Sequence, residues 1–267
     1  MATILATLAA LLSFGCHPGM WRSMGMKQDW KLTVIDVGYG NATLLHYPGF
    51  FAVLVDAGPA EAAGKIVALL ARRGIKHLDA LILTHPHPDH YGGALELTRR
   101  VVVDGIYYNA AVDVPPEEKA KWEELQREST RRGFFLRKLT GGEKLQELEP
   151  FQAEVAPISE GTRDPNDGSL VIRINADGKI IWLACDVGPG VQEKLAGRYR
   201  KSPPADLVQA PHHGGALHPD FLGLAPGALW LISVGPNPWG MPLPATLETL
   251  KGKYLRTDEQ GDLDFEI

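Results

Sequence analysis

The chain has 267 residues, of which 45% are hydrophobic and 22% charged, a composition typical of a globular protein rather than a disordered or fibrous one. Its formal net charge of −5 argues against a surface that coats nucleic acid over its whole area, while leaving room for a local basic channel. The two cysteines, Cys16 and Cys185, are too few for a disulfide scaffold and do not form a CxxC pair.

The first segment is apolar but short. Residues 1–21 include no charge, and residues 2–14 are nearly all apolar. A transmembrane helix needs about 20 apolar residues, and the run is interrupted at 15–18 before it reaches that length. Three interpretations stay open: a signal peptide, a lipoprotein signal that ends at Cys16, and the end of a membrane helix from a larger membrane protein. The alternative to all three is a buried N-terminal helix.

Strands and helices alternate along the rest of the chain. Apolar or alternating runs predict strands within 32–36, 38–47, 50–58, 79–84, 101–108, 169–174, 179–186, 205–213, 228–235 and 262–267. Helical spacing of apolar residues or flanking turn residues predict helices at 61–73, 115–132, 190–197 and 245–251. The sequence therefore predicts one α/β domain over residues 28–267, with two packed sheets covered by helices, preceded by an apolar segment at 1–27.

Three imidazoles and a carboxylate fall within six residues directly after the predicted strand at 79–84, in the stretch "LTHPHPDHYGG". Residues two apart in an extended segment point the same way, so His85 and His87 can bind one metal ion together. The chain then turns, helped by the glycines at 92–93, and Asp89 and His90 face a second position. This spacing predicts the start of a two-metal site.

Two further strand ends complete the predicted site. The strand at 179–186 ends in Asp186, whose two oxygens can bridge both ions, and the segment at 205–213 ends in His212 and His213, followed by glycines. Three strand ends that present metal-binding groups predict one shared centre. Isolated histidines such as His46 and His77 are expected to be ordinary polar residues.

The same residues carry a resemblance to a known family. "THPHPDHYGG" resembles the signature of the metallo-β-lactamase superfamily. From residue 31 to the end, the chain is similar to the C-terminal hydrolase-like domain of the ComEC competence proteins, which import DNA across bacterial membranes. The similarity follows the family's order through "VIDVGYGNATLLHYP", "VLVDAG", "PNDGSLVIRI", "IIWLACD", "APHHGG", "ALWLISVGPNPWG" and "YLRTDEQGDLDFEI".

This resemblance implies an αββα sandwich, a metal-dependent hydrolase site at one sheet edge, and a membrane channel domain of the same protein as a neighbour. It favours the membrane-helix interpretation of the apolar segment at 1–27. The hydrolase domain is then expected to be membrane-associated or exported, and extracytoplasmic.

Four positions depart from the family's pattern. A separate histidine expected before the bridging aspartate is missing, and the segment 165–169 offers only Asn166, Asp167 and Ser169. The turn at 38–41 has Asn41 where the family usually has aspartate. Cys185 stands where glycine is usual and is expected to be a small buried residue. Met241 replaces a common histidine.

We assign His85 and His87 to one ion, Asp89 and His90 to the other, and Asp186 to both. Between the two late histidines, His213 is favoured as the ligand, and His212 as the donor to a substrate phosphate. Mixed histidine and aspartate ligation suits two divalent ions, Zn or Mn. The expected metal ligands are thus His85, His87, Asp89, His90, Asp186 and His213, and the residues expected to act in catalysis are Asp89 and His212.

Two ions can activate a shared water for attack on a phosphodiester without a covalent nucleophile. The chain has no GxSxG motif and no cysteine with an evident base partner. Three functions stay open: a phosphodiesterase or nuclease domain of a ComEC-type protein acting on single-stranded DNA, an exported hydrolase of a small phosphoester or lipid headgroup, and a binding domain without turnover. Basic runs at 131–132, 137–138 and 198–201 would favour DNA if they line the approach to the metals.

Overall fold

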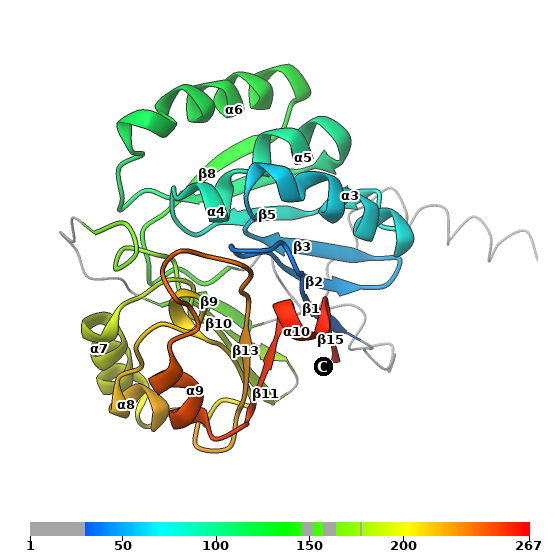
Figure 1. Cartoon of the computed structure of the whole chain (residues 1–267). Coiled ribbons are helices and arrows are strands. Elements are labelled where there is room, and N and C mark those ends of the chain that lie inside the picture. The colour runs from blue at the N-terminus through cyan, green and yellow to red at the C-terminus, as the bar shows by residue number, and fades with distance from the viewer. Residues whose placement is uncertain (1–29, 146–151, 157–163, 177) are drawn as a thin grey trace, which may run out of the picture.

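The computed structural model describes residues 30–145, 152–156, 164–176 and 178–267, so the predicted apolar segment at 1–27 lies outside the described residues. Two sheets pack face to face, and helices cover both outer faces (Figure 1). This four-layer arrangement is the predicted αββα sandwich. Across the described ranges, no helix combines the length and the apolar character needed to cross a membrane.

The first sheet has seven strands in the order β15-β1-β2-β3-β5-β7-β8. Its strands are β1 (Lys31–Val34), β2 (Thr43–Tyr47), β3 (Phe51–Val55), β5 (Ala80–Leu83), β7 (Gly105–Asn109), β8 (Phe135–Leu139) and β15 (Leu263–Glu266). From β3 to β8 all neighbours run parallel. The 3-10 turns η1 (Ala60–Ala62) and η2 (Pro116–Glu118) precede α3 (Ala63–Arg72) and α6 (Lys119–Arg132), which cover the outer face of the sheet together with α5 (Ala94–Arg100) (Figure 1).

The second sheet has six strands in the order β14-β13-β12-β11-β10-β9. They are β9 (Gln152–Val155), β10 (Ile172–Ala176), β11 (Lys179–Leu183), β12 (Leu207–Gln209), β13 (Leu229–Ile232) and β14 (Tyr254–Arg256), with β11 to β14 parallel. Helices α7 (Pro189–Tyr199), α8 (Pro219–Leu222) and α9 (Pro244–Leu250) cover it on the opposite side of the molecule (Figure 1). The remaining elements are a small sheet of β4 (His77–Leu78) and β6 (Val102–Val103), and the short helices α4 (Pro88–Tyr91), η4 (Pro211–His213) and α10 (Thr257–Gln260).

A continuous apolar layer lies between the two sheets. Leu32, Val55 and Ile82 of the first sheet and Ile181 and Leu183 of the second belong to it and are fully buried. Burying one such side chain stabilises the fold by about 1.5–3 kcal/mol. Because both sheets share this layer, their strand ends are held at fixed positions relative to each other.

The predicted strands have narrower or shifted bounds in the structure, and three of them show this clearly. The run at 101–108 is divided between β6 and β7, which belong to different sheets. A Cβ on Gly105 would lie 2.2 Å from the ring of Phe135, so β7 begins at a glycine over which β8 packs. The segment at 169–174 becomes a strand only from Ile172, and the segment at 205–213 leaves the sheet after Gln209.

The carboxyl ends of four parallel strands meet at one edge of the sandwich. β3 ends before Asp56 and β5 before Thr84, whereas β11 and β12 of the other sheet lead to Asp186 and His213. The carboxyl ends of parallel strands are the usual position of a ligand site in open α/β sheets. The fold therefore brings all of the predicted strand ends to one place.

Candidate metal centre

The segment that holds the first four predicted ligands leaves β5 and turns into α4. The chain is still extended at His87 (φ −87°, ψ 143°), and Pro88 then begins the helix. Proline suits the first helical position because the N–H that it lacks would have no helical partner there. His85 and His87 therefore project from the strand end, and Asp89 and His90 from the helix.

Close backbone contacts explain two glycines around this turn. A Cβ on Gly93 would lie 2.3 Å from the carbonyl oxygen of Ala57, and one on Gly40 would lie 2.4 Å from that of Asp89. Any larger residue would push α4 away from the strand ends. The glycines thus allow the helix that carries Asp89 and His90 to pack directly on the sheet.

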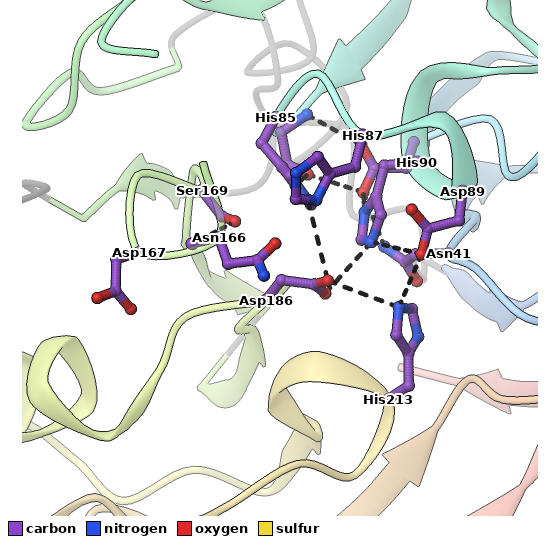
Figure 2. Close-up of polar contacts among 12 residues, drawn as sticks. Asn41, His85, His87, Asp89, His90, Asn166, Asp167, Ser169, Asp186 and His213 are labelled. Carbon is purple, nitrogen blue, oxygen red and sulfur yellow. Dashed lines mark hydrogen bonds and ion pairs between the residues drawn. The ribbon is translucent and has the colours of Figure 1, made fainter. Parts of the chain in front are cut away.

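Asp89, His90, Asp186 and His213 form one group, whose ligand atoms all lie within 4.8 Å of one another. The Nε2 atom of His90 is 3.2 Å from Oδ1 of Asp186, and the Nε2 atom of His213 is 3.2 Å from Oδ2 of Asp89. Figure 2 shows these side chains pointing toward a common space. The group thus combines two residues of α4, which follows β5 of the first sheet, with two residues that follow β11 and β12 of the second sheet.

His85 and His87 form a second group beside the first. The Nε2 atom of His85 lies 3.1 Å from Nδ1 of His87 and 3.9 Å from Oδ2 of Asp186. The same Asp186 oxygen is 3.6 Å from Nε2 of His213 (Figure 2). Asp186 therefore lies between the two groups, which is the position that a bridging carboxylate needs.

Hydrogen bonds behind the rings determine which nitrogen faces the group. The Nδ1 atom of His90 is 2.7 Å from the Asp56 carboxylate, and the Nδ1 atom of His213 is 2.8 Å from the carbonyl oxygen of Ser233. Both partners only accept hydrogen bonds, so in each ring Nδ1 carries the proton that it donates. Each Nε2 is then available to a metal ion, and its ring is fixed in orientation.

Asp56 is a functional residue that the sequence reasoning missed. It is fully buried after β3, with a left-handed φ of 60°. Its carboxylate accepts hydrogen bonds from the N–H (2.9 Å) and the hydroxyl (2.9 Å) of Thr84 and from the amide of Asn41 (3.0 Å), in addition to His90. Since the Thr84 hydroxyl donates to Asp56, its oxygen can accept from Nδ1 of His85 at 3.2 Å. The available signal was an aspartate at the end of the buried strand in "VLVDAG".

The donor atoms fit divalent metal ions. Two ligand atoms about 2.1 Å from a tetrahedral ion lie about 3.4 Å apart, close to the 3.1–3.2 Å separations in both groups. The Nε2 atoms of His90 and His213 are buried and make no hydrogen bond, which is costly unless a ligand completes them. Imidazoles with carboxylates suit Zn and Mn. The residues present therefore fit a centre for divalent metal ions.

Asn166 occupies the side of the centre where the sequence lacks a histidine. Figure 2 shows its amide pointing toward Asp186, whereas the carboxylate of Asp167 points away and accepts from the N–H of Gly188 at 2.9 Å. The Oδ1 atom of Asn166 is buried without a hydrogen-bond partner, and Ser169 is turned back to the Asn166 carbonyl at 2.6 Å. Of the three candidates, Asn166 is thus the one that can add an oxygen ligand.

Two further departures from the family's pattern, Asn41 and Met241, have structural explanations. Asn41 donates to Asp56 and accepts from Nε2 of Gln209 at 2.6 Å, a pairing that needs both halves of an amide. Met241 is half-buried against the apolar layer under α7 to α9, and both its N–H and its carbonyl bond to Asn237. Neither residue replaces a missing member of the donor groups.

His212 and Cys185 lie next to ligands but outside both donor groups. His212 is half-buried with a left-handed φ of 51°, and its ring centroid is 6.2 Å from that of His213. Cys185 is fully buried with a φ of 50°, a backbone conformation that favours the glycine expected there. Burial, together with Asp56 and Asp186, raises the pKa of the Cys185 thiol well above its usual value. The thiol is therefore protonated and is not a nucleophile.

The charges within the groups are strongly coupled. Burial alone would lower the pKa of His90, but the carboxylates of Asp186 and Asp56 outweigh it and raise that pKa well above its usual value. Burial would raise the pKa of Asp186, but His90 and His213 hold it well below its usual range. Without metal, His90 is therefore a cation between two carboxylates.

A pocket of about 270 Å³ adjoins the centre on the side of His85. Tyr108 and Trp122, whose ring centroids are 4.8 Å apart, line it together with Lys138. Among the residues of the predicted basic runs, Lys138 thus lies in the pocket beside the centre. Arg131 and Arg132 instead pair with Glu128, and Arg198 lies over the ring of Tyr199.

Comparison with known proteins places this geometry in a family. The sequence profile described as the metallo-beta-lactamase superfamily matches residues 35–243. The ComE operon protein 3 of Bacillus subtilis is 25% identical over 265 residues, which cover 90% of this chain and 33% of that protein. The competence protein ComA of Neisseria gonorrhoeae is 27% identical over 252 residues, which cover 90% of this chain and 32% of that protein. The chain thus spans about a third of the length of these relatives.

Solved structures share the fold. Igni18, a metallo hydrolase from the archaeon Ignicoccus hospitalis, superposes with a TM-score of 0.55 at 16% identity, covering 89% of this chain and 99% of that one. A diphosphatase of the PhnP family superposes with a TM-score of 0.50 at 14% identity, covering 89% of this chain and 98% of that one. At these identities the likeness establishes the fold alone.

The position of Asp186 between the groups leads to a prediction about metal content. The wild-type protein should bind about two equivalents of Zn or Mn, Asp186→Ala should lose both, and His87→Ala should lose mainly one. Elemental analysis of the loaded and desalted variants measures this. Equal partial loss in both variants would show that Asp186 does not bridge, and metal-free wild-type protein with an intact fold would rule out the centre.

Asp56 should act on metal binding without touching the ions. Replacing a partner that orients a ligating histidine typically weakens metal affinity about 10- to 100-fold, and we expect this for Asp56→Asn in competition with a chromogenic chelator. The matched control is Asp104→Asn, because Asp104 holds an exposed histidine, His77, at 2.7 Å, the same separation as Asp56 and His90. Equal affinity in the two variants would show that Asp56 does not support the centre.

The raised pKa of His90 leads to a pH dependence. Below that pKa the ring is protonated in the metal-free protein, so a metal ion must displace a proton, and affinity should rise with pH. Calorimetry in buffers of different ionisation enthalpy should detect proton release near pH 7. His90→Gln should release fewer protons than the wild type. Metal binding without proton release would contradict the charge state described for His90.

Proposed function

Because the chain belongs to the metallo-β-lactamase superfamily and is a metallo-hydrolase domain with competence-protein relatives, we propose that it is a phosphodiesterase acting on single-stranded DNA. The observation that carries the proposal is the pair of donor groups that share Asp186. Two ions that share a carboxylate can stabilise the entering and leaving oxygens of a phosphodiester and activate the attacking water. The likeness to DNA-uptake proteins supports DNA as the polymer.

In this proposal the chain's own residues bind, orient and exchange protons. Asp89 has the more accessible carboxylate, since its side chain is 23% exposed against 4% for Asp186. Burial would raise the pKa of Asp89, but the neighbouring His213 and the charge of His90 lower it to about 2, so Asp89 is anionic at neutral pH. It can therefore accept a hydrogen bond from the attacking water. We assign to His212, half-buried beside His213, the donation of a hydrogen bond to a phosphate oxygen.

A small phosphoester is the second candidate, and the pocket beside His85 favours it. About 270 Å³ of space lined by Tyr108 and Trp122 can hold the organic part of a small ester, with Lys138 near its charge. The PhnP-family structure is a diphosphatase, but at 14% identity it supports only the fold. A fold of this kind supports several chemistries, so the substrate has to be decided by experiment.

We further propose a membrane channel domain of the same protein as the partner of this domain, and a membrane-associated, extracytoplasmic location. The support is the resemblance to ComEC-type proteins together with the third of their length that the chain spans.

The wild-type protein should cleave a labelled single-stranded oligonucleotide in Mn or Zn, and Asp89→Ala should reduce kcat/KM about 100-fold or more. Cleavage should fade as salt rises, with a modest slope, because a chain of net charge −5 makes few phosphate contacts. Asp104→Asn, a change of an exposed carboxylate, serves as the control and should cleave like wild type.

Two other results would redirect the proposal. Cleavage of bis(4-nitrophenyl) phosphate without cleavage of DNA in either metal would favour the small phosphoester. Full metal content with no cleavage of either substrate would favour a binding domain.

A further inference from the structure

A row of rings in contact leads from the candidate metal centre to the surface. The ring of Tyr39 lies 4.4 Å from that of the predicted ligand His213, and the ring of Trp239 lies 4.7 Å from Tyr39 at an interplanar angle of 32°. Trp239 is 62% exposed. The row therefore begins at a metal ligand and ends in an indole that faces solvent.

Trp239 sits on a loop that is held in place. The side chain of Asn237 donates to the carbonyl oxygens of Gly235 and Met241 and accepts from the N–H groups of Trp239 and Met241, at 2.7–3.1 Å. A Cβ on Gly235 would lie 2.5 Å from the backbone of Gly38, so this loop and the loop of Tyr39 are in direct contact. The exposed indole is thus preorganised, and little conformational entropy is lost when a ligand covers it.

Large exposed hydrophobic side chains are few in the described part of the chain: Phe50, Val102, Phe135 and Trp239. Phe50 also stacks on a tyrosine, with its centroid 5.2 Å from Tyr47, but it lies in the turn between β2 and β3, at the opposite end of these strands from Asn41 and Asp56. Trp239 is therefore distinguished by its place beside the metal centre.

We propose that Trp239, backed by Tyr39, is a stacking platform for a base of the single-stranded nucleic acid whose phosphate lies at the metal centre. This inference rests on the proposed function and names a substrate contact for it. Aromatic platforms suit single strands because every base has a π-face, so binding does not depend on sequence. An uncharged indole also suits a chain of net charge −5, because the overall charge does not favour holding a strand by its phosphates alone.

Aromatic rings on the His85 side of the centre support a polymer as the substrate. His85 and His90, with centroids 4.1 Å apart, continue the row away from His213, and His85 borders the pocket lined by Tyr108 and Trp122. The metal centre thus lies between two aromatic surfaces. A strand that extends past its phosphate on both sides can use both surfaces, whereas a small phosphoester can use one.

The test measures binding rather than cleavage. The metal-loaded full chain is titrated with a labelled phosphorothioate oligothymidylate, which resists hydrolysis, and with an abasic oligomer of the same length. Trp239→Ala should weaken binding of the oligothymidylate about 5- to 100-fold, as expected for the loss of one stacked base, and should leave the abasic oligomer unchanged. Trp239→Phe should retain most of the affinity, and Phe50→Ala, the matched exposed aromatic, should behave as wild type.

Three outcomes would overturn the platform: Trp239→Ala binds the oligothymidylate like wild type, it loses both oligomers equally, or wild type does not prefer the oligothymidylate to the abasic oligomer. Metal content and thermal melting of each variant verify the fold. Cleavage is measured separately, so a wild type that shows the base-dependent binding but does not cut DNA would refute the proposed function and leave the platform intact.

Discussion

The hydrogen bond between the Asp56 carboxylate and Nδ1 of His90 is the constraint on which the centre depends. It lies in a fully buried position, where an unpaired carboxylate would be very costly, and Thr84 and Asn41 satisfy the other lone pairs. Asn41 continues the network to Gln209 on β12, so the chain of polar contacts crosses from the first sheet to the second. The network that fixes the ring of His90 therefore also fixes the register between the sheets at this edge.

The two donor groups are unequal, and the inequality comes from one position. The group of Asp89, His90, Asp186 and His213 has four donors, two of them with their tautomers set by hydrogen bonds. Among the described residues, the group of His85 and His87 has Asp186 and the amide of Asn166 to add. A neutral amide oxygen is a weaker ligand for a transition metal than an imidazole. Ions bound to the two groups would thus differ in how readily they exchange.

The sequence was most informative where the chemistry is local. The run from His85 to His90 concentrates four donors in six residues, and Asp186 and the late histidines each end an apolar run, so the fold class and the donor groups could be predicted. Asp56 could not, because its partners lie 15 to 34 residues away and a single aspartate after a strand has no distinctive pattern. Sequence named Asn166 only as one of three candidates, since its direction depends on a turn that Ser169 closes.

Left-handed backbone recurs after three of the four strands that meet at the candidate centre: at Asp56 after β3, at Cys185 after β11, and at His212 and His213 after β12. Residues other than glycine pay about 1–2 kcal/mol for this conformation. The edge that carries the chemistry is therefore a local weak point that the apolar layer between the sheets must offset. Cys185 illustrates this directly. A glycine there would remove the strain of the left-handed conformation, but it would also make the backbone next to Asp186 more flexible. Rigidity of the backbone at Asp186 and overall stability are opposed at this residue.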